Sequence, residues 1–115
     1  MSEQEVLEQR FYISRLYDLY GALLTERQRR VYELRELDDL SLSEIAAELS
    51  ISRQGVSDQL QRVRDRLEEL EKLLGFHSLL QTIEREAELI GQGGAPLEHA
   101  AKIAEACRGR TMNDV

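Results

Sequence analysis

Apolar positions recur at helical spacing along most of the chain. Between Val6 and Leu24 the apolar residues are separated by one, three or four positions, which is typical of an amphipathic helix with one broad buried face. The string TERQ, which begins at Thr25, is a capping box and predicts a second helix that runs to about Leu37. Asp38 and the residue after it end this second helix.

Two serine-rich segments predict the starts of the next two helices. Ser41 or Ser43 is the expected N-cap of a third helix, which ends near Ser50. Ser52 is the expected N-cap of a long fourth helix over residues 53–74, and Gly75 follows as its C-terminal stop.

Within residues 53–74 the apolar positions form a heptad stripe: Val56, Leu60, Val63, Leu67, Leu70 and Leu74. Two interpretations of this stripe remain open. The helix could pack on the N-terminal helix within one chain, or it could form the seam of a homodimer. The second interpretation is attractive because paired helix-turn-helix units read paired half-sites.

The C-terminal part is expected to be less ordered. A fifth helix is predicted over residues 78–90, and residues 91–96 (GQGGAP) have the composition of a linker. Residues 97–107 could form a short helix, but its apolar side is mostly alanine, so we expect weak docking or disorder. The pattern predicts an all-α fold of about five helices, with a helical domain over 1–90 and a tail over 91–115.

Composition limits the class of protein. The chain has 115 residues, a net charge of −7 and one cysteine, Cys107, which excludes an intramolecular disulfide framework. The N-terminus lacks the basic and apolar stretches of a signal peptide, and no apolar run approaches the ~20 residues of a membrane span. We therefore expect a cytoplasmic protein.

The most specific signal is the segment LSLSEIAAELSISRQGVSDQLQRVR, residues 40–64. Two helices joined by a short turn need a small residue where they touch, and Ala46 can supply it against Val56. The remaining members of the apolar wedge are Ile45, Leu49, Ile51 and Leu60. Ser50 stands where many such motifs have glycine, which is tolerable if the turn avoids a positive φ. A helix-turn-helix is predicted over residues 41–66.

In a helix-turn-helix the second helix presents its N-terminal outward face to the major groove. The positions expected to read bases are Arg53, Gln54, Ser57, Asp58 and Gln61, and those expected to hold the phosphate backbone are Arg62, Arg64, Arg27 and Arg30. Asp58 would repel phosphate unless it accepts a hydrogen bond from cytosine or pairs with Arg62. Residues 51–75 contain five basic and five acidic side chains, whereas residues 1–50 contain six and eleven.

No group of residues predicts catalysis or cofactor binding. His77 and His99 have no partner at metal-ligand spacing, and Cys107 has no motif for nucleophilic catalysis. We expect no metal, no cofactor and no enzyme activity. The aromatic residues near the N-terminal helix follow helical spacing and are expected in the core or in an interface: Phe11, Tyr12, Tyr17 and Tyr20.

These motifs carry two resemblances. Residues 22–64 resemble the helix-turn-helix of sigma-factor region 4, and residues 11–90 more closely resemble the YlxM family of small bacterial helix-turn-helix proteins. The markers are FYISRLYDLYGALLTERQ, the segment DDLSLSEIA, and SRQGVSDQLQR leading into the heptad helix. The resemblance implies a regulatory protein linked to the signal recognition particle pathway.

Two functions from different classes follow. The first is a regulator that binds duplex DNA. The second is a protein–protein adaptor whose acidic surface binds a basic partner, for which the resemblance implies the signal recognition particle GTPase, its receptor or the ribonucleoprotein itself. For either function the resemblance implies the protein or RNA of the signal recognition particle as a partner. Binding of structured RNA is a third, lesser alternative.

Overall fold

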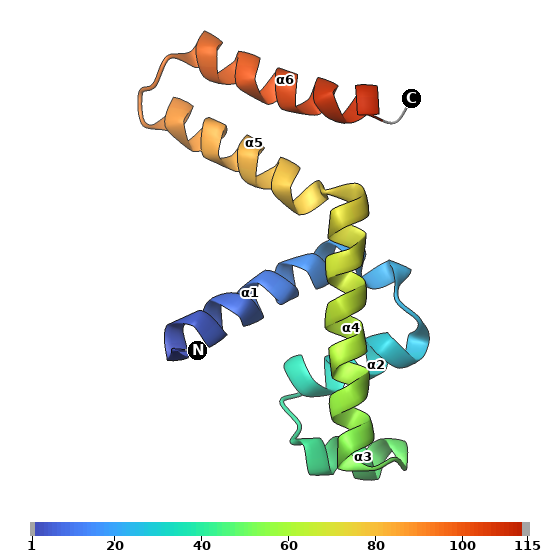
Figure 1. Ribbon diagram of the computed structural model, residues 1–115. Helices are drawn as coiled ribbons and strands as arrows, with labels where there is room; N and C mark the ends of the chain where they lie inside the picture. The colour runs from blue at the N-terminus through green and yellow to red at the C-terminus, as the bar shows by residue number, and fades with distance from the viewer. Residues whose placement is uncertain (1, 114–115) are drawn as a thin grey trace. The chain divides into compact units, whose positions relative to one another are not determined.

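The computed structural model describes the backbone of residues 2–113 and the side chains of residues 2–109. Throughout this part the regular elements are helices, so the all-α prediction is confirmed (Figure 1). The contacts divide the chain into two compact units, Met1–Leu74 and Gly75–Val115. None of the described helices is both long and apolar enough to cross a membrane.

The first unit contains four α-helices and a short 3-10 helix. These are α1 (Glu3–Tyr20), η1 (Gly21–Leu23), α2 (Glu26–Glu36), α3 (Leu42–Leu49) and α4 (Arg53–Leu74). Helix α1 is shifted from its predicted range, because the Ser2 hydroxyl accepts a hydrogen bond from the Glu5 amide at 3.1 Å and caps the helix early. The helix then ends before Gly21, where a Cβ would lie 3.2 Å from the ring of Tyr17.

Both predicted N-terminal signals of α2 and α3 are capping boxes in the structure. Thr25 Oγ1 accepts from the Gln28 amide at 3.1 Å, and the Gln28 side chain accepts from the Thr25 amide at 3.0 Å. Ser41, rather than Ser43, caps α3 through the same reciprocal pair of bonds with Glu44. Because each box satisfies two amides that the helix leaves unpaired, these starts are fixed locally.

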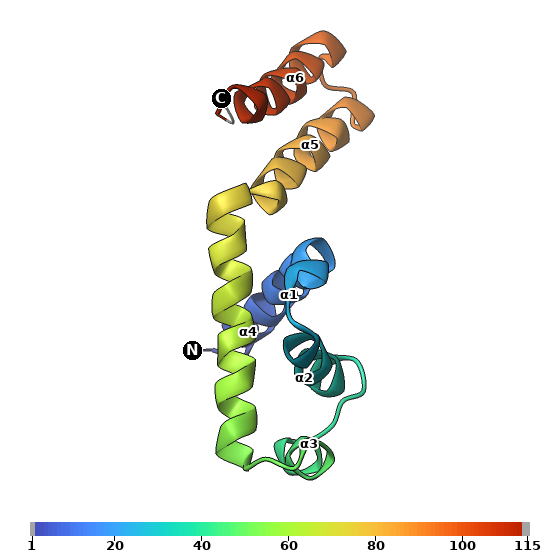
Figure 2. The same ribbon diagram turned by 90° about the vertical axis from the view of Figure 1, so that its right-hand side faces the viewer.

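Helix α4 packs against α1, α2 and α3 within the first unit (Figure 2). Its heptad residues are buried in this contact, with Val56, Val63 and Leu67 fully inaccessible and Leu60 and Leu70 nearly so. Residues from all four helices complete the core, among them Leu16, Tyr20, Val31 and Ile45. Of the two interpretations left open for the stripe, the structure therefore supports packing within one chain and contradicts a homodimer seam along these residues.

The second unit is a hairpin of α5 (Phe76–Gly91) and α6 (Pro96–Asn113), which pack side by side and antiparallel. Residues 91–96 are a tight helix stop and not an open linker. The Gly93 amide donates to the Ile90 carbonyl at 3.0 Å and the Gly94 amide to the Leu89 carbonyl at 2.8 Å, which is a Schellman motif with Gly93 at φ +93°.

Helix α6 is longer than the predicted segment 97–107, since Pro96 occupies its first position and the helix continues to Asn113. The contacts also divide the chain after Leu74, whereas the sequence analysis places the boundary after residue 90. The difference arises because α5 finds its partner in α6. His99 of α6 and the buried Glu86 of α5 are hydrogen-bonded within this hairpin, at 2.5 Å, which sequence spacing did not indicate.

Candidate nucleic-acid interface

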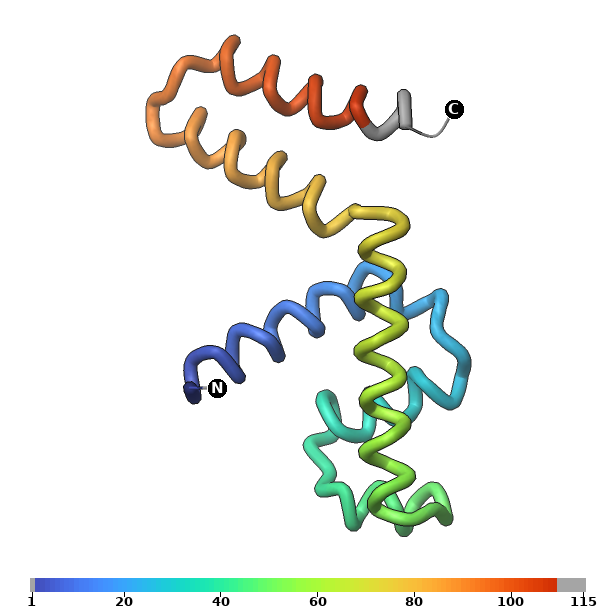
Figure 3. The backbone as a smooth tube through the Cα atoms, viewed as in Figure 1, coloured from blue at the N-terminus to red at the C-terminus, as the bar shows by residue number. Residues whose placement is uncertain are grey.

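The interface is built on the α3–turn–α4 unit, whose backbone is traced in Figure 3. Ala46 and Val56 both lie in the hydrophobic core, with Ile45 and Leu60 beside them and Leu49 and Ile51 packed against it. Helix α4 begins at Arg53, and the Ser52 hydroxyl accepts from the Gly55 amide at 2.9 Å. The core side of this unit thus leaves the opposite face of α4 to solvent.

The turn between the two helices corrects one expectation. Ser50 has φ 56° and ψ 45°, in the left-handed region, although the motif was expected to tolerate serine by avoiding a positive φ. The strained position persists because the Ile51 amide donates to the Ala46 carbonyl at 3.0 Å, and because Ile51 packs on the core. The turn keeps the left-handed geometry that glycine usually adopts, at a conformational free-energy cost of about 1–2 kcal/mol for serine.

A solvent-filled hollow lies where the starts of α3 and α4 come together. Arg53, Gln54 and Ser57 line it from α4, and Ser41, Leu42 and Ser43 line it from α3. The structure thus gathers three of the five residues predicted to read bases, and adds two serines that the sequence analysis considered only as caps. Hydroxyl, amide and guanidinium groups in this arrangement can donate to phosphate or to base edges.

Two glutamines on the outward face of α4 are held by aspartates of the same helix. Gln54 Nε2 donates to Asp58 Oδ1 at 3.0 Å, and Gln61 Nε2 donates to Asp65 Oδ1 at 2.9 Å. Asp58 therefore pairs with Gln54, and the suggested pairing with Arg62 is wrong. Sequence reasoning missed Asp65, although its spacing of four from Gln61 is the signal that indicates such a pair.

The arginines differ in their availability for phosphate. Of the arginines predicted for this interface, Arg27, Arg53, Arg62 and Arg64 form no side-chain hydrogen bond or ion pair with the described residues. Arg30 is bound to Glu48 of α3 at 3.1 Å, in an exposed ion pair that would have to open for phosphate. Arg66 is bound to Glu69 in the same way.

The residues predicted to contact DNA do not all lie on the same part of the surface. Arg53, Ser57, Gln61 and Arg64 are spaced by four, four and three residues, which puts them along one side of α4. Gln61 and Arg64, however, line a separate groove formed with α1 and α2. Arg62 lies outside both concavities, as do Arg27 and Arg30 of α2.

Glu44, in the first turn of α3, has a lowered pKa. Hydrogen bonds from the backbone and side chain of Ser41 lower the pKa of Glu44 below its ordinary value of 4.5. Glu44 therefore stays ionised at the start of α3, where it stabilises the helix but opposes a nearby phosphate. Among the described residues, no cluster of three His, Cys, Asp or Glu side chains could hold a metal ion.

The helix-turn-helix geometry agrees with the comparison of sequences. The family profile described as "Putative helix-turn-helix protein, YlxM / p13 like" (UPF0122) matches residues 7–105. The chain belongs to this family. Relatives in the UPF0122 family include a protein of Caldanaerobacter subterraneus subsp. tengcongensis, 47% identical over 79 residues, which covers 69% of this chain and 68% of the relative.

Other UPF0122 relatives align over longer stretches. A protein of Halalkalibacterium halodurans is 42% identical over 87 residues, covering 76% of this chain and 77% of its own. A protein of Geobacillus kaustophilus is 41% identical over 105 residues, covering 87% of this chain and 96% of its own. The UPF0122 match extends past residue 90, where the noted resemblance ended, and so takes in both units of the fold.

Proposed function

We propose that this UPF0122 chain is a cytoplasmic regulator that binds duplex DNA through the N-terminal half of α4. The observation that carries the proposal is the hollow at the start of α4, where Arg53, Gln54 and Ser57 meet the start of α3. Arg53 is exposed and has no acidic partner among the described residues. Arginine binds guanine bidentately and glutamine binds adenine, so both side chains suit base reading in the major groove.

Asp58 determines how Gln54 can act. The hydrogen bond from Gln54 to Asp58 orients the amide group before DNA arrives, which lowers the entropy cost of binding. The Asp58 carboxylate also repels phosphate unless it accepts from cytosine N4. We therefore expect Asp58→Asn to raise affinity for unselected duplexes, because it removes a negative charge from the interface.

The test begins with duplexes selected from a randomised pool by the full-length protein. The variant carrying Arg53→Ala and Gln54→Ala is then compared with the wild type by fluorescence anisotropy on a selected duplex. We expect binding to weaken by ~2–4 kcal/mol, since each good base contact contributes ~1–3 kcal/mol.

A matched control removes the same residue types from the second unit. Gln81 and Arg85 are both exposed on α5, and the double variant Gln81→Ala, Arg85→Ala should bind like the wild type. If the Arg53 and Gln54 variant also binds like the wild type, these residues do not read DNA. If no duplex is enriched even at low salt, the chain does not bind DNA.

A second candidate is favoured by the acidic side chains of α4. Asp58, Asp65, Glu68 and Glu69 lie within three helical turns, and the whole chain has a net charge of −7. Such a surface suits a protein–protein adaptor with a basic partner. The GTPase protein of the signal recognition particle is the probe for this candidate, because binding to it without duplex affinity would support an adaptor. Binding to the RNA of the particle would not, because RNA is itself an anion.

A further inference from the structure

The first part of α1 leaves the hydrophobic core, and this part (residues 3–11) is called the α1 arm below. All its residues are exposed, and the core contribution of α1 begins at Ile13. Figure 1 shows the N-terminal end of α1 lying away from α4, whereas Gln9 still donates to Glu68 of α4 at 3.5 Å. The arm nevertheless carries three apolar side chains, with Leu7 52% and Phe11 66% exposed and Val6 similarly accessible.

The three exposed apolar side chains of the arm lie close together in the sequence, unlike the isolated ones found on most protein surfaces. Isolated exposed apolar residues are normal, but several within two helical turns indicate an interaction surface. The sequence analysis expects Phe11 in the core or in an interface, and the structure excludes the core. Three of the six polar residues of the arm are acidic, Glu3, Glu5 and Glu8, and with Arg10 they give the arm a net charge of −2.

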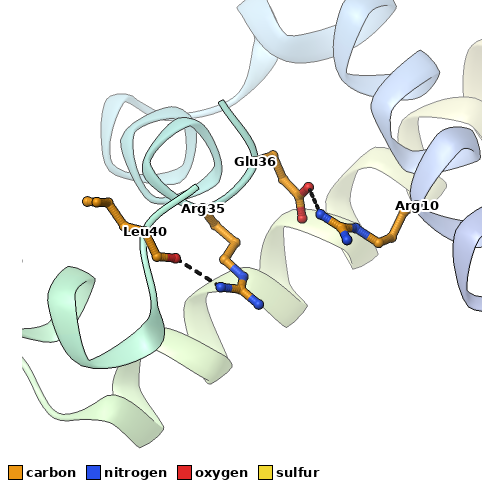
Figure 4. Close-up of polar contacts among 4 residues, drawn as sticks. All are labelled: Arg10, Arg35, Glu36 and Leu40. Carbon is orange, nitrogen blue, oxygen red and sulfur yellow. Dashed lines mark hydrogen bonds and ion pairs between the residues drawn. The ribbon is translucent and has the colours of Figure 1, made fainter. Parts of the chain in front are cut away.

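Beside the arm lies a groove between α1, α2 and α4, called the arginine groove below. Its apolar lining is Val6, Ile13, Tyr32 and Leu60, and its three guanidinium groups belong to Arg10, Arg35 and Arg64. Figure 4 shows Arg10 donating to Glu36 at 2.8 Å and Arg35 donating to the Leu40 carbonyl at 2.9 Å. These bonds hold two of the guanidinium groups in place beside the groove.

The groove is lined by more positively charged than negatively charged side chains. Its two carboxylates are Glu36, already bound to Arg10, and Glu68, to which Gln9 of the arm donates at 3.5 Å. Hydrogen bonding and charge from Glu36 also raise the pKa of Arg10, which keeps it cationic. Arg64 has no ion-pair partner among the described residues.

The arm and the groove are therefore chemical complements on the same molecule. The arm presents apolar side chains among carboxylates, and the groove presents an apolar lining among guanidinium groups. The arm also forms one wall of the groove, so the two halves are one continuous surface. A continuous self-complementary surface closes into a two-fold dimer, in which each copy supplies the same patch.

We propose that two copies of this chain associate through the α1 arm and the arginine groove, with the arm of each copy seated on the groove of the other. Leu7 and Phe11 supply the apolar contact, and the three arm glutamates face Arg10, Arg35 and Arg64 of the second copy. Gln61 and Arg64 then belong to the dimer contact, which leaves Arg53, Gln54 and Ser57 for the hollow at the start of α4.

The test measures molar mass by light scattering and sedimentation over a range of concentrations, with no nucleic acid present. It is thus independent of the proposed DNA binding. Leu7→Ser together with Phe11→Ser should raise the dimer dissociation constant about 30-fold or more, because a buried aromatic anchor dominates such interfaces. Both residues lie outside the core, and circular dichroism checks that the variant stays folded.

Two controls make the result specific. Leu37→Ser with Leu73→Ser removes apolar residues of equal exposure, 68% and 69%, outside the arm and groove, and should leave the dimer unchanged. Glu3→Gln, Glu5→Gln and Glu8→Gln should weaken the dimer and flatten its salt dependence, whereas Glu84→Gln, Glu88→Gln and Glu105→Gln should not.

Three results would overturn the proposal. The first is a wild-type monomer at every concentration. The second is a dimer that the arm variants leave intact. The third is a dimer that the Leu37 and Leu73 variant disrupts as strongly as the arm variants do.

Discussion

Ser50 shows how a single residue can carry strain for the geometry of a whole motif. Its φ of 56° is the conformation that glycine adopts without steric cost, and the Ser50 amide still donates to the carbonyls of α3 that the helix end leaves unpaired. The burial of Ile45 and Val56 on either side of the turn outweighs this strain. The turn is therefore set by tertiary packing and not by the preference of serine.

Ser50→Gly is expected to stabilise the protein by about 0.5–1 kcal/mol. Relief of the left-handed strain exceeds the added entropy of glycine in the unfolded chain. Urea unfolding followed by circular dichroism measures the change. Ser43→Gly, in the first turn of α3, is the control and should be destabilising, so equal effects of the two changes would contradict the account.

Tyr17 offers a second prediction for one side chain. Partial burial and a hydrogen bond from its hydroxyl to Glu33 Oε1, at 2.7 Å, raise its pKa to about 12. Glu33→Gln should lower this pKa toward the ordinary value of 10.0 without reaching it, because burial remains. NMR titration of labelled tyrosine, assigned with Tyr17→Phe, gives the measurement.

The sign of the associated pH dependence follows from linkage. The folded state favours protonated Tyr17, so this contribution to stability is complete below pH 10.0 and is lost as the pH rises toward about 12. In Glu33→Gln the loss should be smaller over the same interval. A pKa of Tyr17 that does not respond to Glu33→Gln would show that the hydrogen bond does not form in solution.

At the scale of the element, the starts of α2, α3 and α4 were predictable, whereas the helix partners were not. Thr25 and Ser41 cap their helices through bonds within four residues, so the signal is local and visible in the sequence. The end of α1 at Tyr20, where the chain passes into the 3-10 helix η1, has no comparable capping signal in the sequence. The pairing of α5 with α6 depends on side chains more than ten residues apart, such as Glu86 and His99.

The capping box of α3 links helix stability to the charge of Glu44. Ser41→Ala removes the hydroxyl that accepts from the Glu44 amide, and should destabilise the protein by ~1 kcal/mol. It should also raise the pKa of Glu44 part of the way toward 4.5, because the larger cause of its depression, the backbone amide of residue 41, remains and only the hydroxyl is lost. NMR titration of the Glu44 carboxyl measures the shift.

The pH window of this effect is acidic. The folded state favours ionised Glu44, so its contribution is complete above pH 4.5 and is lost as the pH falls below that value. Thr25→Ala, in the other capping box, is the control and should leave the Glu44 pKa unchanged. A Glu44 pKa that is the same in wild type and Ser41→Ala would contradict the capping geometry.

In the α5–α6 turn, the backbone at Gly94 passes so close to Leu89 and His99 that there is no room for a side chain. A Cβ on Gly94 would lie 2.7 Å from the Leu89 carbonyl oxygen and 2.8 Å from His99 Nε2. Gly94→Ala should therefore separate the two helices and speed hydrogen exchange of α6 amides. Gly91→Ala has open space around the added methyl group and should leave the exchange unchanged or slower. Equal protection in both variants would show that the turn is not tightly closed.

For the whole molecule, the sequence was sufficient for the class of fold and for placing the candidate residues along α4. The core positions of α4 follow one heptad stripe, which predicts their burial but not which surface covers them. Arg53, Gln54 and Ser57 were placed correctly on one helix, but their meeting with Ser41 and Ser43 depends on the angle between α3 and α4. The pairing of Arg30 with Glu48 likewise depends on the packing of α2 on α3.

The overall charge makes the proposed DNA contact a local exception. A chain with net charge −7 gains no general attraction to phosphate, so any duplex affinity must come from a few arginines in one place. This makes the number of contacted phosphates small, and measurable as the slope of binding against salt.

That slope is the most direct test of the central claim that the start of α4 contacts duplex DNA. Affinity for a random-sequence duplex is measured at several salt concentrations for wild type, for Arg53→Gln with Arg62→Gln, and for Arg85→Gln with Arg108→Gln on the second unit. The account predicts that the first pair lowers the slope of log affinity against log salt by about one, because Arg62 is assigned to phosphate and Arg53 to bases, and that the second pair leaves it unchanged. Equal slopes for all three proteins, or no binding by wild type at the lowest salt, would contradict it.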